Sequence, residues 1–159
     1  MDAERPAAGR PRKEWYASGL RFTCEAGCGL CCTGAPGFVW VTAEEIADIA
    51  ARLGLPADLF ARRCLRRVYG KVSLKEQPGG DCIFLERPAM TCGIYDVRPT
   101  QCRTYPFWPE ILRSREHWEA EAGVCPGLGA GRLHPGEECA RKAAETLLAG
   151  RATARKLPL

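Results

Sequence analysis

The stretch "FTCEAGCGLCCTG", residues 22–34, places four cysteines within nine positions: Cys24, Cys28, Cys31 and Cys32. A disulfide between the two adjacent cysteines would be strained, because neighbouring Cα atoms lie about 3.8 Å apart and a disulfide usually needs at least about 4.4 Å. Clustered thiols that stay reduced more often bind metal or carry out redox chemistry. The stretch therefore predicts a metal-binding loop.

The composition of the chain also indicates that its cysteines stay reduced. Ten of the 159 residues are cysteine, a smaller fraction than the roughly 8–10% of a secreted disulfide scaffold. The N-terminus "MDAERPAAGRPRKEW" contains no apolar signal-peptide core, and no stretch approaches the roughly 20 apolar residues of a membrane span. We therefore expect a cytoplasmic protein with no membrane partner.

The formal charge of +4 does not predict a nucleic-acid partner. Most of the excess base lies near the two ends of the chain, and the middle is close to neutral. A nucleic-acid surface more often combines clustered base with interleaved aromatic residues on one folded face. The internal cluster "RRCLRR", residues 62–67, is typical of the solvated side of a helix. We expect no nucleic-acid partner, and the sequence names no protein partner.

Local patterns predict an α+β fold, with helices packed on a short antiparallel sheet and cysteine-bearing loops around a metal centre. "GFVWVT", residues 37–42, is typical of a strand. Thr42 and Glu45 have the spacing of a capping box, and Gly54 ends the helix that follows. Further elements are a helix from Pro56, two strands around the Pro-Gly-Gly turn of residues 70–86, and a helix over residues 135–150.

The domain boundaries follow from the same patterns. Residues 1–20 and 151–159 are expected to be terminal tails, which leaves residues 21–150 as one cysteine-cluster domain. Within it, "TCGIYDVRPTQCRTYPFWP", residues 91–109, and "VCPGLGAGR", residues 124–132, are expected to be loops. His117 and His134 are isolated and are expected at the surface or in packing.

The ten cysteines divide into two kinds. Cys64 and Cys139 lie in line with apolar residues at helical spacing, so we assign them to packing. The others are predicted metal ligands: Cys24, Cys28, Cys31, Cys32, Cys82, Cys92, Cys102 and Cys125. Eight thiolates make two sets of four, enough for two zinc ions or two clusters. Adjacent Cys31 and Cys32 are expected to project differently, and so to form a branch point between metal atoms.

The spacing favours an iron–sulfur cluster over zinc. Structural zinc usually has two C-x2-C pairs, whereas the leading pattern here is C-x3-C-x2-C-C. Cys125 followed by Pro126 has the Cys-Pro ending of bacterial ferredoxin runs. Because either centre is negatively charged, Arg98 and Arg103, and also Arg21, are candidates to offset its charge and so to contact the cofactor.

Four blocks of sequence carry a family resemblance: "FTCEAGCGLCC", "DCIFLE", "CGIYDVRPTQCRTYPF" and "CPGLGAG", between residues 22 and 131. In this order they resemble the YkgJ family of cysteine-cluster proteins, known as zinc- or iron-chelating domains. The sequence departs from the family pattern in having three residues, not two, between its first two cysteines. The resemblance implies metal chelation by the eight cysteines named above and implies no established reaction.

Two hypotheses of function follow. In the first, which we favour, the protein is a metal-binding module with a structural, metal-handling or electron-transfer role. In the second, it is an iron–sulfur enzyme that uses S-adenosylmethionine for radical or methyl-transfer chemistry. The spacing from Cys24 to Cys31 is that of radical enzymes, and a cysteine cluster of this kind resembles one in flagellin lysine N-methylases. The surplus of thiolates and the short chain argue against an enzyme.

Overall fold

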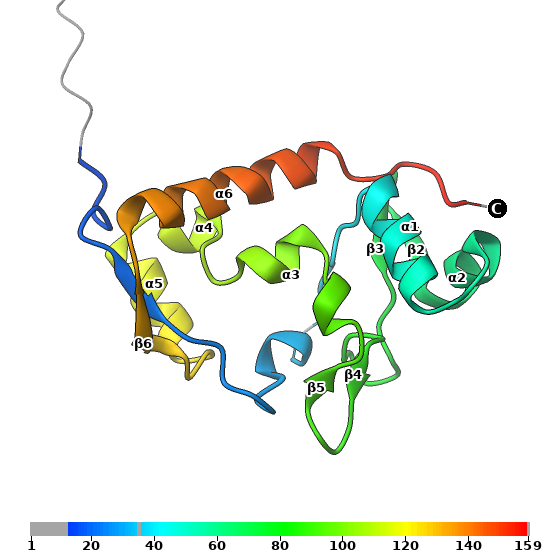
Figure 1. Cartoon of the computed structure of the whole chain (residues 1–159), viewed down its shortest axis with the longest axis horizontal. Helices are drawn as coiled ribbons and strands as arrows, with labels where there is room; N and C mark the ends of the chain where they lie inside the picture. Colours follow the sequence, from blue (N-terminus) through cyan, green and yellow to red (C-terminus); the bar gives the residue numbers. More distant parts are fainter. Residues whose placement is uncertain (1–12, 35, 159) are drawn as a thin grey trace, which may run out of the picture.

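The computed structural model describes residues 13–34 and 36–158. Helices and three two-stranded antiparallel sheets form an elongated molecule, with α6 (Gly136–Arg151) running along its upper side (Figure 1). This arrangement confirms the α+β prediction, although the strands form three separate pairs and not a single sheet. Among the described residues, no helix combines the length and apolar character that a membrane crossing requires.

One end of the molecule is built from α1 (Ala43–Arg52), α2 (Ala57–Cys64) and the hairpin of β2 (Leu65–Val68) and β3 (Lys71–Leu74). The Thr42 hydroxyl accepts the Glu45 N–H, and the Glu45 carboxylate accepts the Thr42 N–H, so the predicted capping box is present. Gly54, at a φ of +64°, follows the last turn as predicted. The buried side chains of this end form what we call the first core, centred on Ile49, Phe60 and Val72.

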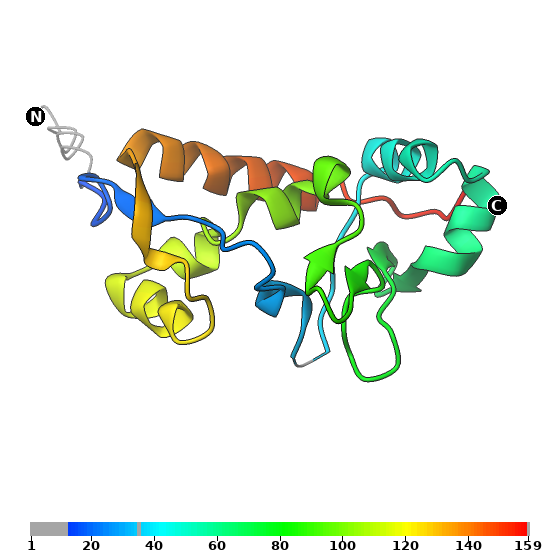
Figure 2. The same cartoon turned by 60° about the horizontal axis from the view of Figure 1, so that its bottom comes forward.

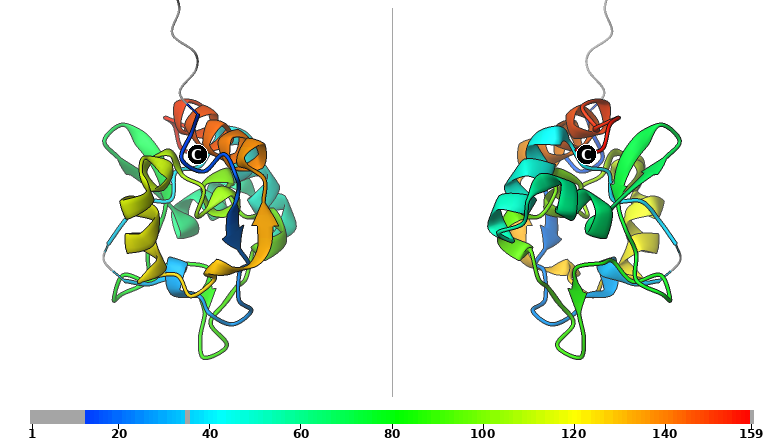
Figure 3. Two further views of the ribbon diagram at one scale, coloured as in Figure 1. Left: turned by 90° about the vertical axis from the view of Figure 1, so that its left-hand side faces the viewer. Right: turned by 90° about the vertical axis from the view of Figure 1, so that its right-hand side faces the viewer.

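The opposite end contains β1 (Leu20–Phe22), β6 (Leu128–His134), α4 (Pro109–Leu112), α5 (Arg115–Ala122) and the first half of α6. Figure 3 shows β1 and β6 side by side when the molecule is viewed from this end. Phe107 and Trp118 lie at the centre of a second core, in which Cys139 is fully buried. Cys64 is buried in the first core, so both cysteines assigned to packing lie in apolar surroundings.

Short elements occupy the middle of the molecule, between the two cores (Figure 2). They are η1 (Leu30–Cys32), the pair of β4 (Leu85–Glu86) and β5 (Thr91–Cys92), η2 (Tyr95–Val97) and α3 (Thr100–Thr104). Helix α3 packs beneath α6, where the Thr146 hydroxyl donates to the Thr104 hydroxyl at 2.7 Å. Six of the eight predicted ligands lie on or next to these elements: Cys28, Cys31, Cys32, Cys82, Cys92 and Cys102.

Four segments differ from the sequence prediction. The two strands expected around the Pro-Gly-Gly turn do not pair with each other, because β3 pairs with β2 and β4 pairs with β5. "GFVWVT" forms only isolated bridges, of Trp40 with Ser73 and of Thr42 with Thr153. Residues 91–109, predicted as loop, contain β5, η2, α3 and the start of α4. The glycine-rich residues 128–134 form β6, because the strand is completed by main-chain pairing with β1 and needs few apolar side chains.

The two terminal segments also differ from the expected tails. Residues 1–12 and residue 159 lie outside the described residues, but Tyr16 is buried in the second core and Trp15 packs against it. At the other end, Arg151 is the last residue of α6, and the Ala154 N–H donates to the Val41 carbonyl at 2.8 Å. Apolar side chains and main-chain pairing therefore carry the folded structure beyond residues 21–150.

We expect Thr42→Ala to lower the free energy of unfolding by about 1 kcal/mol, because it leaves the Glu45 N–H without its capping acceptor. Urea denaturation monitored by circular dichroism measures the effect. Ser18→Ala, in an exposed turn, is the control and should change the free energy of unfolding little. Equal effects of the two substitutions would show that the capping box does not stabilise the first core.

Candidate metal centre

A cavity of about 150 Å³ lies at the junction of the two cores, and cysteines line much of its wall. Five of the eight predicted ligands line it: Cys24, Cys28, Cys31, Cys102 and Cys125. Arg98, Arg103 and Tyr105 complete its polar lining together with Glu25. The other three predicted ligands, Cys32, Cys82 and Cys92, lie beside Cys31 and Cys102. The fold therefore gathers five of the eight around one cavity and places the other three near enough to act on them electrostatically.

The loop that carries the first four cysteines passes very close to the backbone of Met90. Gly29 has a φ of +56°, and a Cβ placed on it would lie 2.8 Å from the Met90 carbonyl oxygen. Glycine is therefore required here for its backbone conformation and for the small space it needs. The Cys32 N–H then donates to the Gly29 carbonyl at 3.0 Å, which closes the short η1 helix that carries Cys31 and Cys32.

The Cys31 and Cys32 sulfurs lie 4.0 Å apart. The two side chains therefore do not diverge as the sequence analysis expected, because η1 turns both sulfurs toward the same region. Two thiolates on one tetrahedral zinc, each bonded at about 2.3 Å, are about 3.8 Å apart, so this spacing suits ligands of one metal atom or of neighbouring atoms.

The neighbours of Cys31 and Cys32 nevertheless differ. The thiolate charge of Cys31 acts on Cys24 on one side and on Cys82, Cys92 and Cys102 on the other. The Cys32 sulfur lies 4.0 Å from that of Cys31, and its thiol also interacts with that of Cys82. Cys31 thus acts on cysteines of both groups, and a branch point between metal atoms at the doublet stays a prediction.

Backbone hydrogen bonds fix the remaining ligands. The Cys82 N–H donates to the Cys32 carbonyl at 2.8 Å, which joins two distant segments. Cys92 lies on β5 and Cys102 on α3, so neither is in the loop that the sequence predicted. Cys125 follows α5, where its N–H donates to the Glu121 carbonyl at 2.9 Å.

Cys125 and Cys24 are held together by a tight crossing of two chain segments. The Thr23 N–H donates to the Gly127 carbonyl at 3.2 Å. A Cβ on Gly127 would lie 2.1 Å from the Thr23 carbonyl oxygen, so only glycine fits at this crossing. The turn beside Cys125 therefore has a structural role, because it lets the two segments approach this closely.

Backbone N–H groups face several of the sulfurs. Those of Phe84, Ile94 and Gly127, each two residues after a cysteine, interact with Cys82, Cys92 and Cys125 respectively. Each of these bonds lowers the pKa of its thiol, since an N–H stabilises the thiolate. Hydrogen bonds to sulfur are also a means by which proteins tune iron–sulfur centres.

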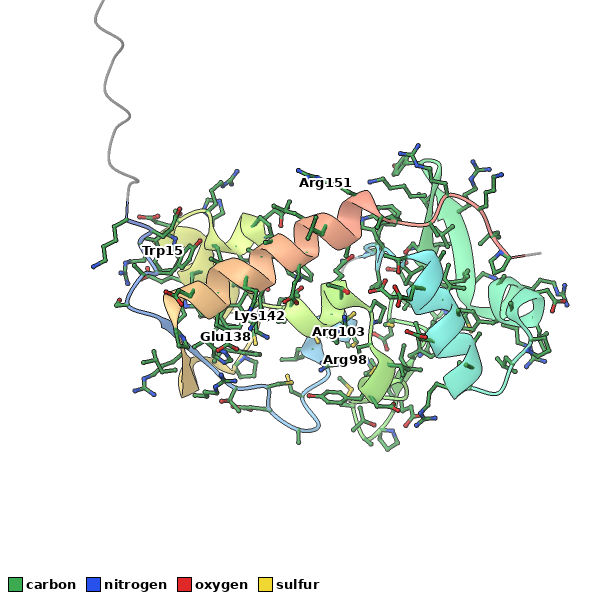
Figure 4. The ribbon with its side chains drawn as sticks, turned by 45° about the horizontal axis from the view of Figure 1, so that its top comes forward. Trp15, Arg98, Arg103, Glu138, Lys142 and Arg151 are labelled. Atoms are coloured by element: carbon green, nitrogen blue, oxygen red, sulfur yellow. The ribbon has the colours of Figure 1, made fainter. Side chains whose placement is uncertain are left out.

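Two arginines supply positive charge at the cavity. The Arg98 guanidinium stacks on the Tyr95 ring, 3.6 Å from its centroid, and its charge lowers the pKa of Cys24, Cys31, Cys92 and Cys102. Arg103 donates to the Arg98 carbonyl at 2.9 Å. Figure 4 shows both arginines in the middle of the molecule. Arg21 instead donates to the Gly131 carbonyl and does not line the cavity.

Burial and thiol–thiol bonding shift the pKa values in opposite directions. Burial is the main cause of the raised pKa of Cys24, Cys92, Cys102 and Cys125. Interaction with the Cys32 thiol, which can donate its proton to a thiolate, lowers the pKa of Cys31 to about 6 and that of Cys82 to about 7. The same two interactions raise the pKa of Cys32.

The donor set fits a metal centre in chemistry and charge. Sulfur is the ligand that zinc and iron–sulfur clusters share, and the N–H groups and Arg98 stabilise thiolates. Within residues 13–34 and 36–158, however, no three Cys, His, Asp or Glu side chains converge closely enough to hold one metal ion. The sulfurs surround a volume and do not meet at a single point.

Two aromatic residues and a carboxylate join the site beyond the predicted residues. The Tyr105 hydroxyl donates to the Glu121 carboxylate at 2.6 Å and also bonds with Cys125. The Tyr95 carbonyl accepts a hydrogen bond from Arg98 Nε, and the Tyr95 ring stacks on the Arg98 guanidinium. No local sequence pattern predicts the hydrogen bond between Tyr105 and Glu121, because the two residues lie in different parts of the fold.

The histidines take no part in the cysteine cluster. His134 is buried, with its ring nitrogens 3.0 Å from the Glu138 carboxylate and 2.9 Å from the Phe22 carbonyl. His117 is exposed and lies 2.8 Å from the Ser114 hydroxyl. These positions agree with the expected packing and surface roles.

A family model described as "CxxCxxCC: Putative zinc- or iron-chelating domain" matches residues 23–126. The chain is also similar to the uncharacterized protein MJ0661 of Methanocaldococcus jannaschii, with 38% identity over 100 residues. That alignment covers 63% of this chain and 52% of the relative, so the chain spans about half the length of the curated relative it matches. No solved structure matches the chain.

In metal-free protein whose circular dichroism shows that the fold is retained, Cys31 should be alkylated by iodoacetamide before the other ligands, because it is exposed and its pKa is lowered to about 6. Its reaction rate should rise with pH through about 6 and then level off, as the thiolate fraction becomes complete. Cys102, with a raised pKa, should react last. Mass spectrometry of peptides after limited labelling measures the order; preferential labelling of Cys102 would contradict this site geometry.

Proposed function

Because the chain belongs to the CxxCxxCC family of zinc- or iron-chelating domains, we propose that its eight clustered cysteines hold iron–sulfur clusters. The observation that carries the proposal is the meeting of eight thiols from widely separated segments at one junction between two cores. Backbone N–H groups and Arg98 favour thiolates there. Packing of apolar side chains alone does not require N–H donors and an arginine beside the thiols.

The ligands divide into two sets of four. In the first set, the charges of Cys31, Cys28 and Cys125 all act on Cys24, and that of Cys31 has the largest effect of the three. Cys32, Cys82, Cys92 and Cys102 make up the second set, with Cys31 adjoining it. Four thiolates complete the usual ligand number of a four-iron cluster or of a zinc ion.

Iron–sulfur is favoured over zinc by the cavity that five of the cysteines line and by the pattern of the cysteines in the sequence. A zinc ion requires all four sulfurs to converge on one atom, whereas a four-iron cluster distributes them over four iron atoms. A cluster therefore suits sulfurs that surround a volume, as they do here. The C-x3-C-x2-C-C spacing and the Cys125–Pro126 sequence support the same choice.

A bound cluster would supply one-electron chemistry, and the residues of the chain would set the conditions for it. Arg98 offsets negative charge from beside both sets of cysteines. The N–H groups of Phe84, Ile94 and Gly127 stabilise the sulfurs. Tyr105, held by its hydrogen bond to Glu121, interacts with the Cys125 thiol and lowers its pKa. We propose an electron-transfer or metal-handling role in a reducing compartment, the cytoplasm.

A module, and not an enzyme, is the function that these observations favour. Eight thiolates are enough to complete the protein ligands of two clusters, which leaves no coordination position for S-adenosylmethionine. Neither the matched family's description nor the relative's name mentions radical or methyl-transfer chemistry.

Anaerobically purified protein should contain iron and acid-labile sulfide in equal amounts, approaching about eight of each per chain after reconstitution. Elemental analysis and visible absorption measure this occupancy. Zinc without sulfide would refute the iron–sulfur assignment and keep the chelating role. Less than about one metal atom per chain after reconstitution with both metals would refute chelation altogether.

Cys31→Ala and Cys102→Ala should each lose metal and much of the fold, because each opens a coordination position and removes metal-linked folding energy. Cys64→Ala and Cys139→Ala are matched controls from the two cores. They should keep the full metal content and lose only about 1 kcal/mol of stability. Metal loss in Cys64→Ala equal to that in Cys31→Ala would show that the division of the cysteines is wrong.

A further inference from the structure

A second, larger hollow lies apart from the cysteine cavity. It has a volume of about 780 Å³ and is bounded by the last turns of α6, the start of α4, and the segments around Trp40, Lys71 and Thr153. We call it the Trp40 groove. Helix α3 separates it from the cysteines, since Gln101 lines the groove and the next residue, Cys102, lines the cavity. No metal ligand takes part in the groove.

The groove is positively charged. Lys71, Arg151 and Arg155 line it, and among the described residues none of the three forms an ion pair. Glu110 is the one carboxylate in the described part of the lining. The Val72 N–H donates to the Ala154 carbonyl at 2.8 Å, so the strand that carries Lys71 and the segment that carries Arg155 are held side by side. Figure 4 shows Arg151 at the end of α6.

Aromatic rings alternate with cations at the edge of the groove. Phe38 stacks on Trp40 with their centroids 5.0 Å apart. The Arg66 guanidinium lies 5.3 Å from the Phe38 centroid, and the Lys71 ammonium lies 5.6 Å from that of Trp40. A second tryptophan, Trp108, lines the groove itself. This alternation resembles the surfaces on which proteins bind single-stranded nucleic acids, where rings stack on bases and cations meet phosphates.

Tyr69 extends this aromatic row at the tip of the β2–β3 hairpin. It lies edge-on to Phe38, with a centroid distance of 6.0 Å, and is 87% exposed. Its φ of +49° is unfavourable for an aromatic residue, and the two-residue turn it forms with Gly70 normally prefers asparagine at this position. Neither burial nor turn geometry accounts for a tyrosine here, which indicates a use for its exposed ring.

We propose that the Trp40 groove binds a short stretch of single-stranded nucleic acid. Its phosphates would lie against Lys71, Arg151 and Arg155, and its bases against Trp108 and the ring of Tyr69. An acidic protein segment would satisfy the cations but would leave the row of rings unexplained, so nucleic acid accounts for more of the surface. The sequence analysis expected no such partner because these residues are scattered along the chain, and only the folded structure places them together.

The test uses metal-loaded full-length protein and fluorescently labelled 15-nucleotide oligo(dT) and oligo(U), followed by fluorescence anisotropy at several salt concentrations. Three phosphate contacts predict a slope of about −2 for the logarithm of the association constant against the logarithm of salt concentration. The triple variant Lys71→Gln/Arg151→Gln/Arg155→Gln should bind at least tenfold more weakly, with a slope near zero. The control Lys13→Gln/Arg63→Gln/Arg115→Gln, which removes the same charge elsewhere, should bind as the unmodified protein does.

A second variant separates binding from folding. Tyr69→Asn suits the turn, so it should preserve or raise stability, while removal of the stacking ring should weaken binding roughly fivefold or more with an unchanged salt slope. Equal weakening by the two triple variants, or no binding by the unmodified protein, would overturn the proposal. Displacement of the oligonucleotide by equally tight binding of polyglutamate would also overturn it, in favour of an acidic protein partner.

Discussion

The crowding of eight thiols where two small cores meet is the constraint on which the rest of this structure depends. Burial raises the pKa of several of these thiols, and each thiolate that forms makes ionisation of its neighbours harder. Metal cations reverse this balance, because they bind thiolates and neutralise them together. Cys82 and Cys92 pack against the first core and Cys125 against the second, so one cluster would lie against each half of the molecule, and adjacent Cys31 and Cys32 would link the two.

The sequence predicted those features that depend on neighbouring residues. The capping box of Thr42 and Glu45, the stop at Gly54 and the last helix all arise from side chains within one or two helical turns. Cys64 and Cys139 were recognisable as packing residues for the same reason, because helical spacing places each in line with apolar neighbours. The cysteine blocks indicated metal binding by their chemistry and order alone.

The features that the sequence did not predict depend on contacts between distant segments. Residues 128–134 lack the apolar pattern of a strand and become one only by pairing with β1. Trp15 and Tyr16 looked like part of a polar tail, yet they complete the second core beside α5 and α6. Cys92 and Cys102 lie on a strand and a helix, because residues 91–109 fold against α6 and the first core. The direction of the Cys31 and Cys32 side chains likewise depended on η1, a turn too short for any sequence pattern to specify.

The second core draws its residues from both ends of the described chain, whereas the first core is formed mostly by residues between 41 and 94. During synthesis the first core can therefore collect most of its side chains while the C-terminal part of the protein is still being made. The second core cannot form until Leu128 and Cys139 have been made and can pack against Tyr16 and Leu20. Cys24 likewise cannot meet Cys125 until then. Both contacts close a loop that contains most of the chain, which costs conformational entropy. Until then the early cysteines are exposed, so the nascent chain would need a reducing environment to reach its native state.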